Sequence, residues 1–361
     1  MIKINRLELA SALTEVKRVK VSKKASLPVL ANVYLYMRDD NLHIFNSDGN
    51  NSIDYKIKVD NDPVDFKAAV NLIELDKIIR KFKNDILTLS VEDNYFIVSN
   101  NSTSLKLKNS ADAYPMLPNT PNELLFELER DQFVNLFKNG LYAISKQQSR
   151  PILTGFNLIS DGKTLEVNST DSYRLVHTKI KFNSHTDLNI TIKSNFIDMI
   201  LKSKLKDDLK VYTDNHLIMI QTGSVTYHSK LMEGNYPAVD RLIPREHTTH
   251  LVIDDLKGLI DALDLAKITL EKEARAYITI KLIDGRGIIT TPGNDFKHEI
   301  KGSYKMDDLS VSVNPEYLTD ALKQLDNSKP VDFKFSSSLR PFTLTQENDD
   351  TLHLLVPVRP R

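Results

Sequence analysis

The chain has 361 residues, enough for two or three domains, and its 48 Lys+Arg residues balance its 48 Asp+Glu residues. This neutrality excludes wholesale wrapping of nucleic acid through net charge, although one face can still be basic. With no cysteine the chain has no disulfide, no thiolate nucleophile and no cysteine-bound zinc. The sequence holds no apolar run of membrane-spanning length, and residues 1–6 lack the apolar core of a signal peptide, so we expect a cytoplasmic protein.

The first third of the chain predicts a helix, a hairpin, a second helix and a second hairpin. Apolar residues follow helical spacing over 7–21 and again over 72–82, whereas 27–48 alternates around turn residues at 39–41. Two further strands are expected at 86–91 and 95–99.

The same order of elements returns twice. The second copy predicts helices over 130–145 and 196–201, a hairpin over 150–171, and strands at 209–212 and 217–221. The weaker third copy predicts helices over 254–270 and 317–325, a hairpin over 276–292, and strands at 331–335, 342–345 and 354–358.

A period of about 120 residues is too long for a solenoid repeat, so the copies are whole domains. Prolines mark both junctions, and the predicted domains are 1–120, 121–246 and 247–361. Strands interrupted by two helices in each copy indicate an α+β fold, in which helices cover one face of antiparallel sheets.

Positive charge gathers on the predicted helices of the first two copies. Segments 7–24, 71–83, 128–150 and 193–206 hold 17 basic and 7 acidic residues, whereas 254–275 in the third copy holds four basic and six acidic. Lysines on a helix surface often serve only solvation. Their bias across four elements of a repeated architecture instead indicates contact with phosphates that does not depend on base sequence.

Motifs of catalysis are missing. The chain has only 11 glycines and no Gly-rich phosphate loop or nucleophile elbow, and its nine histidines are scattered. The segment 169–173 with His177 offers hydroxyls, a carboxylate and an imidazole, but Ser and Asp at a strand end are foremost turn formers. We therefore expect no enzyme, no catalytic residue, no cofactor and no metal, and keep a hydrolase using Asp171 and His177 as a remote alternative.

The apolar C-terminal segment 353–361 predicts either a last core strand or the edge of a binding cleft. Both roles are compatible if alternate residues face opposite sides. Pro357 cannot donate a ladder hydrogen bond, so strand pairing should end there or reach an edge.

Several short motifs, taken in order, resemble the bacterial β sliding clamp family. They are 27–30 (LPVL), 150–155 (RPILTG), 170–175 (TDSYRL), 233–237 (EGNYP), 339–342 (LRPF) and 355–359 (LVPVR). The resemblance implies three similar DNA-clamp domains per chain and two chains joined head to tail into a homodimeric ring around duplex DNA. It also implies a non-catalytic processivity factor for the replicative DNA polymerase, loaded by a separate clamp loader.

The resemblance further implies a cleft between the second and third domains that binds short linear motifs of the polymerase and the clamp loader. Its apolar walls would accept Leu and Phe side chains of the partner, and its arginines would hold polar or acidic groups. Position by position, the cleft residues are Leu153, Thr170, Tyr173, Arg174, Leu175, Pro237, Arg241, Leu242, Tyr317, Pro341, Leu354, Val356, Pro357, Val358 and Arg359.

DNA-facing positions implied by the resemblance are Lys24, Arg80 and Gln147. Charge and helix position add Lys20, Lys23, Lys146, Arg150, Lys193 and Lys202. The ring interface would join domain one of one chain to domain three of the next, with Leu105 and Leu107 against Ile268 and Leu270 as candidates.

Two departures from the family pattern touch the expected cleft. Tyr173 stands where the family commonly has His, and Pro360-Arg361 form an unusual tail, so the preferred partner motif can differ. The alternative to the clamp is a multidomain α+β protein that binds a peptide or other ligand without encircling DNA.

Overall fold

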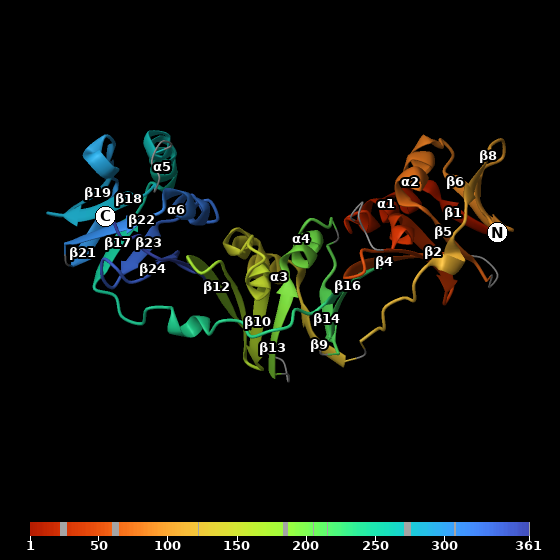
Figure 1. Cartoon of the computed structure of the whole chain (residues 1–361), viewed down its shortest axis with the longest axis horizontal. Coiled ribbons are helices and arrows are strands. Elements are labelled where there is room, and N and C mark those ends of the chain that lie inside the picture. Colours follow the sequence, from red (N-terminus) through yellow and green to blue (C-terminus); the bar gives the residue numbers. More distant parts are fainter. Residues whose placement is uncertain are drawn as a thin grey trace. The chain divides into compact units, whose positions relative to one another are not determined.

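The computed structural model describes residues 1–21, 27–59, 65–121, 123–182, 187–204, 206–214, 216–270, 276–306 and 308–360. They form two compact units (Figure 1). Unit 1 comprises Met1–Phe133 and Asn195–Leu231, and unit 2 comprises Val134–Ser194 and Met232–Arg361. No helix among the described residues is both long and apolar enough to cross a membrane.

Unit 1 contains two antiparallel sheets. The smaller has the order β1 (Ile2–Asn5), β6 (Ile86–Glu92), β7 (Tyr95–Ser99) and β8 (Ser104–Lys108). The larger has the order β5 (Lys67–Asn71), β2 (Asn32–Arg38), β3 (Asn41–Ser47), β4 (Asn51–Lys58), β16 (Val225–Lys230), β15 (Leu217–Thr222), β14 (Leu209–Thr213) and β9 (Glu123–Leu128). Helices α1 (Arg6–Val16) and α2 (Leu72–Lys81) lie side by side against these strands (Figure 1).

Unit 2 likewise contains a large and a small antiparallel sheet. The large one has the order β13 (Asp187–Lys193), β10 (Gly155–Asp161), β11 (Thr164–Thr170), β12 (Arg174–Lys181), β25 (Thr351–Leu355), β24 (Phe342–Thr345), β23 (Val331–Phe335), β17 (Thr249–Ile253) and β21 (Gly302–Met306). The small one has the order β20 (Lys297–Ile300), β19 (Arg286–Thr290), β18 (Ile278–Ile283) and β22 (Leu309–Val313). Helices α5 (Leu256–Leu270) and α6 (Pro315–Leu322) pack on each other.

The three copies share one pairing pattern, to which the third adds β21 beside β17, so the predicted threefold repeat is confirmed. Each copy has a three-stranded meander whose first strand also pairs with a fourth strand: β2 with β5, β10 with β13, and β18 with β22. A helix follows the fourth strand, namely α2, α4 (Ser194–Leu201) or α6. A second meander comes next, and its first strand pairs with the opening strand of the copy: β1 with β6, β9 with β14, and β17 with β23.

Asparagine starts several of these helices. The side-chain oxygen of Asn5 accepts hydrogen bonds from the backbone N–H groups of Leu7 and Glu8, and that of Asn71 accepts one from Glu74. Asn314 caps α6 in the same way. Each cap satisfies backbone donors that the first helical turn leaves free, so the strand-to-helix corner is fixed locally.

One predicted helix is shorter than its hydrophobic spacing suggests. The segment 130–145 forms α3 (Arg130–Phe137) and continues only as a 3-10 turn over Lys138–Ala143. Within this turn only glycine fits at position 140, because a Cβ atom there would lie 2.7 Å from the ring of Phe156 and 2.8 Å from Ser169 Oγ. Ser169 Oγ also donates a hydrogen bond to the Gly140 carbonyl, which ties the turn to β11.

The closing strand also differs from expectation. Pairing in β25 covers Thr351–Leu355 rather than 354–358. Beyond it, the N–H of Val356 donates to the carbonyl of Tyr173, and the N–H of Val358 donates to the carbonyl of Ser312. The chain therefore leaves the ladder just before Pro357, as that proline predicted, and continues along the surface of unit 2.

Candidate functional site

The residues expected to bind partner peptides lie together in unit 2, where β12 pairs antiparallel with β25. In this pairing Arg174 lies opposite Leu355, and Leu175 lies opposite Leu354. We call the fifteen residues named above as cleft positions the partner surface. They come from the 3-10 turn Pro151–Thr154, the end of β11, β12 and the turn before it, the segment 237–242, α6, the residue before β24, and the chain end.

An apolar cluster forms the base of the partner surface. Leu175, Val239 and Leu354 are at most 2% exposed and pack together, and Tyr236 and Val356 pack against them. These residues are contributed by three segments that are far apart in the sequence. The spacing of sequence motifs could indicate the members of this cluster but not their contact.

The residues of the partner surface differ in how exposed they are. Tyr173 is 56% exposed and Leu242 is 48% exposed, which is unusual for large apolar side chains. Buried members are Leu153, Thr170, Arg174, Leu175 and Leu354; partly buried ones are Tyr317, Pro341, Val356, Pro357 and Val358; exposed ones are Tyr173, Pro237, Arg241, Leu242 and Arg359. The exposed members are the ones that an incoming peptide can reach first.

Arg174 is held between two carboxylates. Its Nε donates to Asp171 Oδ2 at 3.0 Å, and its Nη1 donates to Asp320 Oδ2 on α6 at 2.7 Å. Burial alone would lower the pKa of Arg174, but the hydrogen bonds and charges of Asp320 and Asp171 raise it above its ordinary value. Sequence analysis missed Asp320, since an exposed acidic residue on a helix carries no signal of its own.

Two tyrosine rings flank the same guanidinium group. The Cζ atom of Arg174 lies 4.5 Å from the ring centre of Tyr317 and 5.1 Å from that of Tyr142, within the range of cation–π attraction. Tyr173 lies next to Tyr317, with 6.1 Å between ring centres. Exposed Tyr173 therefore extends an aromatic wall that starts at the buried arginine.

Behind this wall lies a buried imidazole. His353 on β25 is fully buried, and its Nδ1 is 2.9 Å from the hydroxyl of Tyr142. Burial lowers the pKa of His353 to about 4, so the ring is neutral at neutral pH.

Asp171 and His177 are not arranged as the remote alternative of a hydrolase requires, because each is hydrogen-bonded to other groups. The carboxylate of Asp171 accepts hydrogen bonds from the backbone N–H groups of Tyr173 and Arg174 and from the Arg174 side chain. His177 is bonded to Asn168 at 2.7 Å instead. Asp171 therefore acts as the turn former and ion-pair partner of Arg174.

Basic candidates of the first copy lie near α1 and α2. Arg80 on α2 donates to Asp76 Oδ1 at 2.9 Å and to Thr14 Oγ1 on α1 at 2.7 Å, and half of its side chain is exposed. Lys17 forms an ion pair with the same Asp76 at 2.7 Å. The single negative charge of this buried carboxylate therefore faces two cations, Lys17 and Arg80, and neutralises only one positive charge. Lys20 is exposed just beyond α1.

The remaining basic candidates sit near helix ends of the second copy. Lys146, Gln147 and Arg150 are exposed between two 3-10 turns, and Lys202 pairs with Asp198 at 2.6 Å just after α4. Lys193 is the last residue of β13. Lys23 and Lys24 lie outside the described residues.

Only half of the four interface candidates are exposed. Leu105 on β8 is 40% exposed and Ile268 on α5 is 63% exposed, whereas Leu107 and Leu270 are buried in the cores of their own units. Leu105 and Leu107 are two residues apart on β8 and so face the same side of the strand, yet only Leu107 is buried. Leu105 also borders a hollow lined by Ile78 and Phe82 and surrounded by lysines.

β8 and β20 differ from the corresponding strands of the other copies in their pairing. Neighbouring copies are joined by one strand from each. The last strand of the first meander in one copy pairs with the last strand of the second meander in the next copy, as β4 with β16 and β12 with β25. In the third copy the corresponding strand is β20, and in the first copy it is β8. Both are edge strands in the chain.

Three family models match the sequence in consecutive segments. They describe the N-terminal, central and C-terminal domains of the DNA polymerase III beta subunit, and they match residues 1–118, 127–238 and 240–359. The chain belongs to the DNA polymerase III beta subunit family. This family is the non-catalytic sliding clamp, so polymerase activity resides in a partner, and membership implies partnership with DNA and the polymerase.

Individual relatives agree over full length. The beta sliding clamp of Streptococcus pneumoniae is 27% identical, with 99% of this chain and 98% of the relative covered. That of Bacillus subtilis is 25% identical, with 94% of each covered. The crystal structure of the beta subunit from DNA polymerase of Streptococcus pyogenes superposes with a TM-score of 0.92 at 23% identity, covering 99% of this chain and 100% of that one. The three-domain clamp fold predicted from sequence is confirmed.

Proposed function

We propose that two copies of this chain close head to tail into a ring around duplex DNA and tether the replicative polymerase. The observation that carries the proposal is the repeated edge pairing. The junctions β4–β16 and β12–β25 use the same kind of strand pairing. The strands that correspond to these partners in the first and third copies, β8 and β20, are edge strands in the described chain. A heterologous contact of this type either closes into a ring or propagates into a filament, and three domains per chain favour closure by two chains.

Charge also supports a contact between the first copy and the third. The hollow beside β8 is surrounded by Lys77, Lys81 and Lys83, whereas the segment 254–275 has six acidic and four basic residues. Opposite charges on the two surfaces would steer association and disfavour contacts between like ends. The apolar centre of the contact would then be Leu105 and Ile268, the two exposed members of the predicted interface.

Inside such a ring, DNA is held topologically rather than by tight binding. Lysine and arginine contacts to phosphates carry no base specificity and remain weak and mobile, which permits sliding. The polymerase and the clamp loader bind the partner surface through short linear motifs, and tethering raises the effective concentration of polymerase at the primer end. The proposal places the protein in the cytoplasm, where bacterial DNA is replicated.

A substitution in the exposed apolar edge tests the ring. Leu105→Asp places a charge at the proposed contact and should weaken the dimer at least about tenfold, since a buried unpaired charge is costly. Native mass spectrometry across micromolar concentrations should show a dimer for the parent and monomer for L105D. Met116→Asp is the matched control, because Met116 is 98% exposed and lies outside the proposed contact. A monomeric parent, or an L105D variant that stays dimeric, would contradict the proposal.

A further inference from the structure

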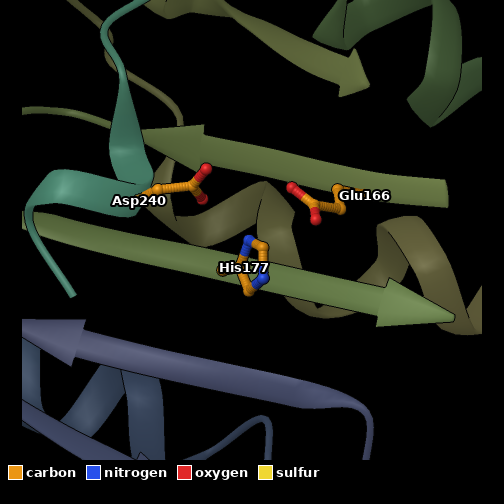
Figure 2. Close-up of side chains that lie close together, drawn as sticks. All are labelled: Glu166, His177 and Asp240. Carbon is orange, nitrogen blue, oxygen red and sulfur yellow. The ribbon is translucent and has the colours of Figure 1, made fainter. Parts of the chain in front are cut away.

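Unit 2 also contains a cluster that the proposed function does not use. Glu166 on β11, His177 on β12 and Asp240 in the 3-10 turn Val239–Arg241 each offer one ligand atom, and these atoms lie within 4.8 Å of one another. Figure 2 shows the carboxylate groups of Glu166 and Asp240 pointing toward each other, with the ring of His177 close to both. Sequence spacing gave no hint of this cluster, since 63 residues separate His177 from Asp240.

Strand register places two of the three groups. Asn168 lies opposite His177, and Glu166 lies opposite Lys179, so all four side chains point to one face of the β11–β12 pair. The 3-10 turn brings Asp240 over that face. Glu166 and His177 are partly buried, and Asp240 is exposed, so the cluster is anchored on the sheet and open on one side.

The hydrogen bond to Asn168 prepares the imidazole as a ligand. His177 Nδ1 lies 2.7 Å from Asn168 Oδ1, and Asn168 is fully buried. With the Asn168 amide in this orientation, its oxygen accepts the hydrogen bond, so Nδ1 donates and Nε2 keeps its lone pair. Metal-binding histidines commonly donate their second N–H to a fixed oxygen in this way, which sets the tautomer.

The described residues do not fully balance the charge of the cluster. Lys179 Nζ lies 2.5 Å from Glu166 Oε1, and no ion pair of Asp240 is found in the described part of the chain, so its carboxylate is an excess negative charge beside the imidazole. The Lys179 side chain is 48% exposed, so it can swing into solvent and give up its place. A dication replacing this ammonium group would neutralise both carboxylates.

We propose that Glu166, His177 and Asp240 form a binding site for a divalent transition metal, with Zn²⁺ as the best-fitting ion. One imidazole nitrogen and two carboxylate oxygens suit zinc, and three protein ligands leave a fourth position for water. Tetrahedral ligands around zinc are separated by about 3.4 Å, so the cluster must contract slightly. Exposed Asp240 can make that movement. The bound ion would fasten the turn 239–241 to the β11–β12 pair.

Metal titration of the full-length protein tests the site. After removal of metals with a chelator, isothermal titration with Zn²⁺ should show one site that Asp240→Asn and His177→Gln each weaken at least about tenfold. Lys179→Met should tighten the same site, because it removes the competing ammonium group. Co²⁺ used as a spectroscopic probe should give visible absorption bands that H177Q loses.

Matched variants keep the result interpretable. Asp208→Asn removes an exposed carboxylate in unit 1, and Lys163→Met removes an exposed ammonium in the β10–β11 turn, and neither should change zinc affinity. Since Asp240 is exposed, D240N tests the site even if H177Q fails to fold. If zinc affinity is unchanged in both D240N and K179M, the bound zinc is an adventitious ion only, held by other histidines, and the proposal is overturned. So would the lack of zinc binding at 100-micromolar metal.

Discussion

At the scale of residues, Arg174 is a member of the partner surface and also holds neighbouring side chains in place. Its guanidinium group already satisfies two carboxylates and stacks on two tyrosines. It is only 8% exposed, so it cannot swing out to meet an acidic partner. The expectation that arginines fix polar groups of a peptide therefore applies better to exposed Arg241 and Arg359. Arg174 instead holds Tyr317, and with it α6, in place beside Tyr173.

We predict that Asp320→Asn weakens peptide binding without unfolding the protein. The substitution removes one of the two carboxylates that orient Arg174, and Asp320 is half exposed, so the cost should be about 1 kcal/mol, or about fivefold in Kd. Fluorescence titration with a peptide carrying a polymerase linear motif measures the change. Glu316→Gln, on the exposed side of the same helix, is the control and should leave Kd unchanged. Equal Kd values for D320N and parent would contradict the role given to Arg174.

A second residue-scale prediction concerns acid stability. Burial lowers the pKa of His353 to about 4, against 6.5 for an ordinary histidine. Between these values the unfolded chain binds a proton that the folded chain excludes, so stability is complete above pH 6.5 and falls as pH drops toward 4. The slope is at most about 1.4 kcal/mol per pH unit for this one group. Thermal unfolding measured from pH 7.5 to 4.5 should show it.

His353→Gln should remove its own share of that pH dependence, because glutamine does not titrate, whereas His228, whose pKa burial also lowers to about 4, keeps its share. His216 is exposed, and His216→Gln should leave the slope of the parent intact. If H353Q and the parent lose stability in parallel on acidification, His353 is not the group responsible.

At the scale of elements, β25 and the residues after it have separate tasks. Leu354 and Leu355 are buried strand residues that join β25 to β12 and β24. In the described part of the chain beyond Leu355, two backbone hydrogen bonds hold the segment: the Val356 N–H donates to the Tyr173 carbonyl, and the Val358 N–H donates to the Ser312 carbonyl. The segment 356–360 therefore belongs to the surface and contributes little to the core.

Deletion of residues 357–361 should abolish stimulation of the polymerase while leaving the dimer intact. The deletion removes three members of the partner surface, Pro357, Val358 and Arg359, but no residue of β25. Primer extension in the presence of clamp loader measures stimulation, and native mass spectrometry of the same sample checks the dimer. Stimulation that survives the deletion would place polymerase docking elsewhere on the chain.

Strands and helices were largely predictable from periodicity, and their exceptions have local causes. The helix over 130–145 ends at Phe137, and the 3-10 turn that follows packs Gly140 tightly against Phe156, a contact with no counterpart in sequence spacing. The apolar and aromatic members of the partner surface could be found from short motifs. Asp320 could not, because it acts through an ion pair with Arg174, and the motif that contains Tyr236 gave no sign that its hydroxyl accepts the N–H of Thr170.

At the scale of the whole molecule, the repeat decides what the chain can assemble into. The copies are joined through one kind of strand pairing, which leaves the edge of β8 at one end of the series and the edge of β20 at the other. Uncovered strand edges of this kind promote aggregation. Closure of two chains covers both. Sequence analysis proposed Leu105, Leu107, Ile268 and Leu270 for the interface and did not predict β20, since a four-residue strand, Lys297–Ile300, gives too little alternation to be recognised.

The charge distribution is consistent with the same assembly. The chain is neutral overall, yet the helices of the first two copies carry most of the excess positive charge. Neutrality keeps non-specific binding to free DNA ends weak, and a ring needs no strong binding, because its topology prevents escape from an intact circle. Retention must then depend on the ends of the DNA rather than on affinity.

Retention of the loaded protein on circular and on linear DNA of the same sequence tests this most directly. After loading onto a nicked circle and removal of free protein, the ring should stay bound through gel filtration at moderate salt. Cutting the circle at one site should release it within the time of the column. Equal retention before and after cutting, or loss from the intact circle, would show that the protein binds DNA as an open patch and would contradict the ring.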